Sequence, residues 1–378
     1  MRLSNKHKIL GFCLAGAVAI FGADARAQTA NVFTVSAIQV DVVSKTAADA
    51  RKQALAEGER RAFEQLLRRL TLRDGYQRLP KFTADEIASF VLEFSVANEK
   101  NSPVRYLADL TFQFKPAEIR NLLRDEGIEF AETKSKPVLI LPVFERAGAV
   151  ALWDDPNPWR KAWTDMPKVD GLVPMRLPGG DLKDIGMLGA EQAVKGDRQR
   201  LAAIAERYAV SATIVAHATL ERSRLGAPIL KLEISTYGNE EREQSLATTL
   251  SADEGENEDA LIVRAAGLIR AMIEDQWKQE NVLQFGQNSV LAAVLPIKGL
   301  SDWVESKRRL ARVAVIERVD LVLLSRREAR INLYYLGEPH QLKLALLQED
   351  LKLTEAEEGE WTLIPIRPTQ INKGRMRK

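Results

Sequence analysis

The sequence predicts an α+β / α/β fold of three small mixed modules in series, of which the middle one is an α/β sheet domain and the last is ferredoxin-like (βαββαβ). Two observations predict this class. Alternating apolar and polar residues, typical of half-buried strands, are interleaved along the chain with apolar residues at helical spacing. One continuous apolar run, Pro137–Val143, is typical of a strand buried on both faces. The 378 residues are 46% hydrophobic, which is sufficient for a buried core.

Residues 1–27, which precede the first module, have the pattern of a secretory signal peptide. A basic start is followed by a 15-residue apolar stretch, and Ala25-Arg26-Ala27 predicts cleavage between Ala27 and Gln28. An uncleaved anchor is the alternative, but such a helix spans only about 22 Å of a hydrocarbon core of roughly 30 Å. Phe12 precedes Cys13 where a lipoprotein signal needs a small residue, so no lipid is expected. We therefore predict export to the periplasm.

The composition that remains after cleavage argues against several classes of protein. The net charge falls from +2 to −1 with the loss of Arg2, Lys6, Lys8, Asp24 and Arg26, so nucleic-acid binding is not expected. Cys13 is the single cysteine, so a disulfide scaffold is excluded. No later segment is apolar over 18 residues, so no transmembrane helix is expected after signal cleavage.

The first module, 28–134, is predicted to be an α+β unit. Its long helix has a stripe of small residues around Gly58, which predicts close packing on a sheet, and Ser44 is its candidate cap. Thr83–Glu86 has the form of a capping box and predicts a short helix toward Phe90. The expected elements are a strand at 32–43, the long helix at 46–70, the short helix, an extended stretch from Phe94, a strand at 106–114 and a helix at 117–125.

The central module, 135–285, begins with the buried strand 137–143 and closes with a long helix. Between them we predict a Trp/Pro-rich segment at 152–167, a strand at 172–177, helices at 181–188 and 198–208, and strands at 212–220, 229–237 and 244–250; the closing helix is expected at 258–280.

The last module, 286–366, supplies the ferredoxin-like order. The expected elements are strand 290–295, helix 302–313, strands 319–324 and 329–335, helix 339–349 and strand 361–364. The basic tail, 367–378, has too few apolar residues to fold and is expected to be disordered.

Several blocks resemble one exported proteobacterial family, described only as domain of unknown function 2066. They are the helical block that ends at Leu70 (ADARKQALAEGERRAFEQLLRRL), Tyr106–Leu123, Lys136–Val143, Trp153–Trp163 and Leu300–Leu336. The resemblance implies a Gram-negative envelope location and brings no assigned catalytic residue. The middle module also resembles, at fold level, the amino-terminal α/β domains of the Tol-system propeller protein, curli-secretion lipoproteins and penicillin-binding-protein activators.

The segment 153–163 (WDDPNPWRKAW) holds the candidate binding residues. Three tryptophans fall within 11 residues, and two of them share a face if Pro158 opens a helix. Aromatic side chains beside polar groups suit a protein partner or a stacked glycan. The alternative, and the commoner fate of tryptophan, is that these side chains cover the end of the sheet while Asp and Asn cap turns. The candidates are Trp153, Asp154, Asp155, Asn157, Trp159, Arg160 and Trp163.

No catalytic, cofactor-binding or metal-ligating residue is predicted. The three histidines, His7, His217 and His340, form no cluster, and we interpret His217 as a strand residue rather than a general base. A Ser–His–Asp arrangement is disfavoured because no nucleophile elbow is present. Gly179-Gly180-Asp181 is better explained as a turn and a helix cap than as an anion site.

Three charged segments are interpreted first as solvated surface. The acidic stretch 253–259 lacks the spacing of a calcium loop. Ser325–Glu328 is expected to be a turn, with contact to an anionic partner as the alternative. For the tail, 367–378, a flexible end and contact with an anionic surface are both kept open.

These observations together predict a soluble, non-enzymatic accessory or scaffold protein of the cell envelope that binds a protein partner. A binder of peptidoglycan or another envelope ligand is the alternative, and it depends on the same tryptophans. An envelope hydrolase is the least favoured alternative, because the adjacent Asp154 and Asp155 point apart. No cofactor is expected.

Overall fold

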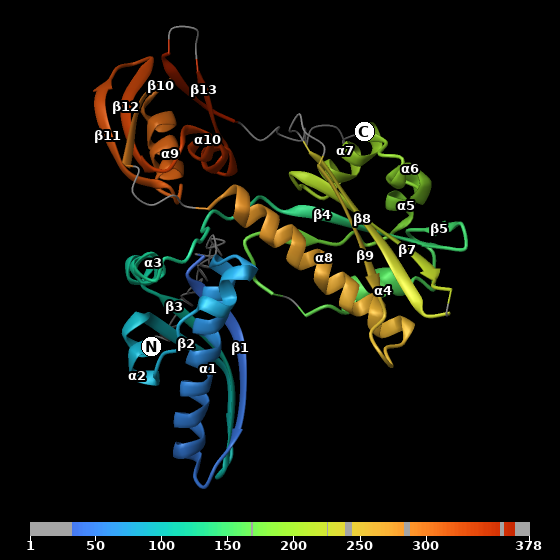
Figure 1. Ribbon diagram of the computed structural model, residues 1–378. Helices are drawn as coiled ribbons and strands as arrows, with labels where there is room; N and C mark the ends of the chain where they lie inside the picture. The colour runs from blue at the N-terminus through green and yellow to red at the C-terminus, as the bar shows by residue number, and fades with distance from the viewer. Residues whose placement is uncertain are drawn as a thin grey trace, which may run out of the picture. The chain divides into compact units, whose positions relative to one another are not determined.

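The computed structural model describes residues 32–167, 169–224, 226–238, 244–282, 288–355 and 359–366. These residues form three sheets, ten α-helices and one 3-10 helix, so the predicted mixed α/β class is confirmed (Figure 1). The predicted signal peptide and basic tail lie outside the described residues. The chain from Val32 onward groups as one compact unit, and the module boundaries stay predictions.

The first sheet has three antiparallel strands in the order β1-β3-β2. Its central strand alternates buried and half-buried residues, as its sequence pattern predicts. The strands are β1 (Thr34–Val43), β2 (Val91–Asn101) and β3 (Arg105–Phe114), and the helices are α1 (Ala47–Leu70), the 3-10 helix η1 (Arg73–Arg78), α2 (Ala84–Phe90) and α3 (Pro116–Asp125).

Helix α1 lies close against this sheet, as the small residues on its stripe predict. A Cβ added at Gly58 would lie 2.5 Å from Cδ1 of Leu110 on β3, so no larger residue fits without a shift. The predicted cap is corrected by two residues, because the side chain of Thr46, not Ser44, accepts from the backbone N–H of Asp49. The capping box predicted at Thr83–Glu86 is confirmed.

The central sheet follows the order β5-β4-β7-β8-β9, with the short strand β6 paired to β4. Strands β4 and β7 are parallel, and β7, β8 and β9 are antiparallel. The strands are β4 (Val138–Arg146), β5 (Ala149–Ala151), β6 (Met175–Arg176), β7 (Ala212–Arg222), β8 (Pro228–Gly238) and β9 (Gln244–Ser251). The predicted strand 172–177 is therefore reduced to two residues.

Helices cover both faces of the central sheet, which explains the continuous apolar run of β4. Ile140 packs in one core with residues of α4 and α8, whereas Leu139 and Leu141 pack on the other side with residues of α6 and α7. The helices are α4 (Pro158–Asp165), α5 (Leu182–Met187), α6 (Ala190–Val194), α7 (Arg198–Arg207) and α8 (Glu258–Glu280).

The third sheet has five strands in the order β11-β12-β10-β14-β13. The predicted element order missed β13, whose five residues are too short for a clear alternating pattern. The inserted strand pairs with β14, which runs parallel to β10, so the ferredoxin-like order is not confirmed. The elements are β10 (Asn288–Pro296), α9 (Leu300–Leu310), β11 (Ile316–Leu324), β12 (Glu328–Leu336), α10 (Pro339–Gln348), β13 (Leu351–Glu355) and β14 (Trp361–Pro365).

Candidate functional site

The predicted binding segment contributes two tryptophans to the core of the central sheet. Trp159 and Trp163 on α4 are 0% and 5% exposed, and their rings meet edge to face at 5.9 Å. The indole Nε1 of Trp159 donates to the carbonyl of Ala216 on β7 at 2.8 Å. Neither ring has a face left for a ligand, so the expected binding role of these two residues is corrected to a structural one.

Asn157 is likewise part of the scaffold. Its side chain is buried and accepts from the backbone N–H of Arg160 at 3.0 Å, which caps the first turn of α4. This is the capping role that the sequence left open as the alternative to binding. The carboxylates of Asp154 and Asp155 lie exposed on the preceding loop, and a binding role for them stays a prediction.

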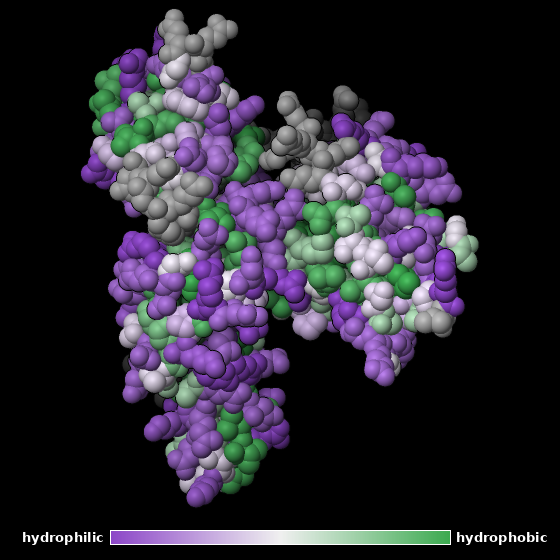
Figure 2. Space-filling model, in the orientation of Figure 1, coloured by the Kyte–Doolittle hydropathy of each residue, from purple (hydrophilic) through white to green (hydrophobic). Residues whose placement is uncertain are grey.

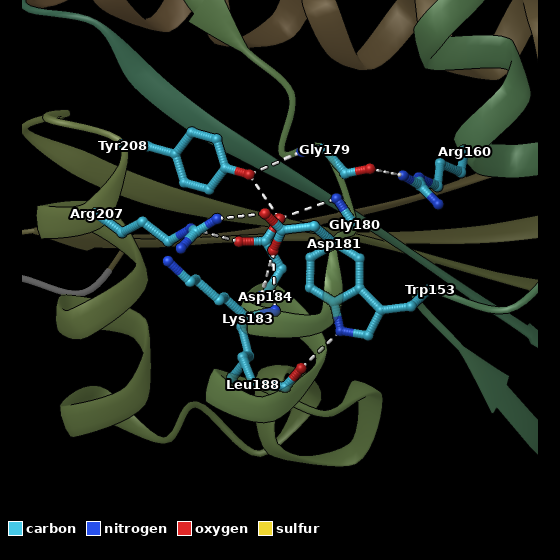
Figure 3. A network of polar contacts seen from close by, with 10 residues as sticks. All are labelled: Trp153, Arg160, Gly179, Gly180, Asp181, Lys183, Asp184, Leu188, Arg207 and Tyr208. Carbon is cyan, nitrogen blue, oxygen red and sulfur yellow. Dashed lines mark hydrogen bonds and ion pairs between the residues drawn. The ribbon is translucent and has the colours of Figure 1, made fainter.

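The remaining two candidates, Trp153 and Arg160, belong to a different cluster. Trp153 is half-buried, and its Nε1 donates to the carbonyl of Leu188 at 2.7 Å. The guanidinium of Arg160 lies 5.8 Å from the centre of the Trp153 ring, and its Nη2 donates to the carbonyl of Gly179 at 2.7 Å. Both residues therefore anchor the loop that leads into α5 and the residues that follow it (Figure 3).

Asp184, at the centre of this cluster, is fully buried inside a polar network. Its Oδ2 accepts from the hydroxyl of Tyr208 at 2.6 Å and from the backbone N–H of Gly180 at 2.9 Å. Its Oδ1 lies 2.8 Å from Nε of Arg207, an ion pair whose N–H is not aligned as a hydrogen bond. A buried carboxylate is stable only with such partners, so the network fixes which side of α5 faces inward (Figure 3).

Asp181 and Arg207 tie the start of α5 to the end of α7. Oδ1 of Asp181 accepts from the backbone N–H groups of Lys183 and Asp184, both at 3.0 Å. Its Oδ2 accepts from Nη2 of Arg207 at 2.6 Å. The predicted helix cap at Asp181 is therefore confirmed, and its carboxylate occupies the place that an anion would need.

The electrostatics of the network keep each group in the form that its contacts require. The backbone N–H of Asp184, with Arg207, lowers the pKa of the Asp181 carboxyl, so it stays ionised. Burial, followed by the hydrogen bond to Asp184, raises the pKa of the Tyr208 hydroxyl, so it stays a donor. Gly180 adopts φ +73°, and a Cβ there would lie 2.5 Å from Nη2 of Arg160.

The consequence is a helix with its polar and apolar sides exchanged. Asp184 points inward, whereas Leu182 is 88% and Ile185 is 47% exposed. A short surface helix ordinarily buries its leucine and isoleucine and exposes its aspartate. We name these two residues the α5 apolar pair; anchored apolar side chains of this kind suit contact with the apolar surface of another molecule.

Sequence patterns could not identify this cluster. Gly179-Gly180-Asp181 predicted the turn and the cap, but Arg207 and Tyr208 lie about 25 residues further on and share no motif with α5. The one available signal was the periodicity of Leu182–Met187 itself, which would have placed the apolar residues inward.

A second candidate site is a hollow of about 370 Å³ over the central sheet. His217 lies in β7, as predicted, directly opposite Glu233 on β8. Its Nε2 is 3.1 Å from Oε2 of Glu145 on β4, although the imidazole is not aligned for a hydrogen bond. Polar side chains of neighbouring strands therefore face one open space, lined by His217, Thr219, Lys231, Leu232, Glu233, Ala247, Thr248 and Thr249.

Two further searches concern only the described residues. No group of three or more His, Cys, Asp or Glu side chains among them is arranged to hold a metal ion. No helix in that part of the chain combines the length and the apolar character needed to cross a membrane.

The charged segments are placed as follows. Residues 253–257 form the loop before α8, where Glu256 accepts from Arg264 and from the backbone N–H of Asp253, contacts that lower its pKa to about 2. Asn257, rather than an acidic residue, caps α8. Ser325–Arg327 form the predicted exposed turn, in which Oγ of Ser325 accepts from two backbone N–H groups.

Comparison with known proteins leaves the family open. No family model matches this chain, and no curated protein matches it. Among solved structures, the lipoprotein GNA1162 from Neisseria meningitidis is similar over 36% of this chain and 97% of its own, with 13% identity and a TM-score of 0.23. At that TM-score the likeness supports no conclusion about fold or function.

Proposed function

We propose that this protein is a non-enzymatic accessory or scaffold protein of the cell envelope that acts by binding another protein. The observation that carries the proposal is the α5 apolar pair, Leu182 and Ile185, held outward by the buried Asp184 network. Exposing two large apolar side chains is unfavourable in water, and a partner surface removes that cost.

The rigidity of the site supports binding rather than incidental exposure. Asp184, Tyr208, Arg207 and Gly180 fix the helix through several short polar contacts, so little conformational entropy is lost when a partner docks. A hydrophobic centre surrounded by polar groups is the usual anatomy of a protein-binding surface, and Lys183 and Asp181 supply such groups here.

The place of action in this proposal is the periplasm, reached through the signal peptide 1–27. Membership of the domain of unknown function 2066 family, and a ferredoxin-like ancestry of the last module with an added strand, are parts of the same proposal. Sequencing the amino terminus of the exported protein should give Gln28. An intact chain that begins at Met1 in the cytosol would contradict the location and every envelope partner drawn from it.

The binding surface is tested by crosslinking from α5. A photoreactive side chain at Lys183 should crosslink one specific envelope protein, and Leu182→Ser with Ile185→Ser should abolish the product. Val263→Ser is the matched control, because Val263 is also 60% exposed but lies on α8. A product that survives the α5 double variant, or the absence of any product, would contradict the proposal.

A second candidate function is binding of a polar envelope ligand such as a peptidoglycan fragment, and the hollow around His217 favours it. Its lining offers carboxylate, imidazole, ammonium and hydroxyl groups within one open space, a set that suits a ligand rich in hydroxyl and amide groups. Co-sedimentation with purified peptidoglycan should then be lost with Glu233→Gln and kept with the α5 double variant. Retention with both variants, or no sedimentation, would count against this function.

A further inference from the structure

Strand β11 forms an edge of the third sheet and is unusually apolar for an edge. It pairs with β12 on one side, and no strand of the described residues pairs with its other side. Four consecutive residues, Leu321–Leu324, are 45%, 62%, 47% and 40% exposed. Figure 2 shows apolar residues gathered at this edge. Edge strands are ordinarily protected by charged residues or proline, and this stretch has neither.

The charges beside this stretch differ in sign at its two ends. Glu317 and Asp320 precede it, and Arg326 and Arg327 follow it. Arg318, which lies at the acidic end, is already engaged, since it pairs with Asp320 at 3.2 Å and lies 3.9 Å from the ring centre of Tyr334. The strand therefore presents an acidic end, an apolar centre and a basic end.

We propose that β11 is a self-association strand, through which two copies of this chain pair antiparallel. A twofold axis near the middle of Leu321–Leu324 brings the two apolar centres together. It also places the acidic end of each copy beside the basic end of the other, so the surface is complementary to itself. This inference goes beyond the proposed function and uses a different surface.

The local backbone limits the association to two copies. The register against β12 shifts between Leu321 and Leu323, which marks a β-bulge and curves the strand. Because each copy contributes its own β11 edge, the pairing uses up both edges and closes as a dimer rather than continuing into a fibre.

The first test measures the mass of the purified protein in solution by analytical ultracentrifugation over a range of concentrations. Wild type should dimerise, and Val322→Lys should weaken the dimer at least about tenfold, since a charge would be buried at its centre. Val290→Lys is the matched control, because Val290 is 58% exposed but lies on the central strand β10. A monomer at every concentration, or equal weakening by both variants, would overturn the proposal.

The second test exploits the two charged ends. Arg327→Glu and Glu317→Arg should each weaken their own dimer, because like charges then meet at both ends. An equimolar mixture of the two variants should recover a dimer of wild-type strength, since every end is again opposite in charge. Failure of the mixture to recover would overturn the antiparallel arrangement, and dimerisation that appears only after deletion of 367–378 would assign the edge to the chain's own tail.

Discussion

Helices α4 and α5 of the central sheet follow opposite rules. Both are short, and both begin after a loop whose Asn or Asp side chain caps the first turn. Helix α4 buries its tryptophans and exposes its charges, as amphipathic periodicity predicts. Helix α5 buries Asp184 and exposes Leu182. The difference teaches that periodicity decides orientation only where no polar network competes for the inner side of the helix.

The comparison is broken most severely by removing an aromatic side chain of α4. Trp159→Ala should lower the free energy of unfolding by about 3–5 kcal/mol, because a fully buried indole is lost and a cavity remains. Denaturant unfolding measures the change. Trp159→Phe keeps most of the volume and should cost less, about 1 kcal/mol of it from the lost hydrogen bond to Ala216. A stable Trp159→Ala that merely loses a partner would restore the binding role.

The equivalent change in α5 should have a smaller effect. Asp184→Asn leaves one buried group without a proper partner and should cost about 1–3 kcal/mol. Tyr208→Phe removes a single hydrogen bond and serves as the milder companion. Limited proteolysis should detect opening near 177–188 in Asp184→Asn. Unchanged protection there would show that the network does not orient α5.

Acid should act on α5 through Asp181. Its folded-state pKa lies below the ordinary value of about 3.9, so the charged form stabilises the folded state above about pH 4. That contribution is lost as the pH falls through the lower folded-state pKa. Asp181→Asn keeps a cap acceptor but cannot ionise, so its deficit in melting temperature should be present at neutral pH and vanish in strong acid. A deficit that is constant with pH would contradict this role of the charge.

The smallest effect is expected at the exposed side of α5. Leu182→Ser should change the free energy of unfolding by no more than about 0.5 kcal/mol, because the side chain is 88% exposed. Leu188→Ala, at a fully buried leucine, should cost about 2–5 kcal/mol. Thermal unfolding of both variants compares them directly. A large loss for Leu182→Ser would mean that the leucine packs inside the protein, and the proposed binding surface would fail with it.

Much of the local structure followed from sequence patterns. Helix α8 begins and ends at the predicted residues, and Gly58 lies where its small size is needed. Strand β13 was missed because Leu351–Glu355 is too short to show a period. The candidate site was predicted less well. Of the seven residues named, Trp159, Trp163 and Asn157 are buried in scaffold roles, whereas Trp153 and Arg160 lead to the network that the sequence did not indicate.

The sequence by itself determined the mixed α/β class, most helices and strands, and the caps at Thr83 and Asp181, because these depend on neighbours within a few residues. Only the tertiary structure decided that Asp184 lies inside and Leu182 outside, and that β11 stands at an edge with its leucines exposed. Both outcomes depend on partners distant in the chain, Tyr208 and Arg207 for the helix and β12 for the strand. No local pattern of apolar and polar residues contains that information.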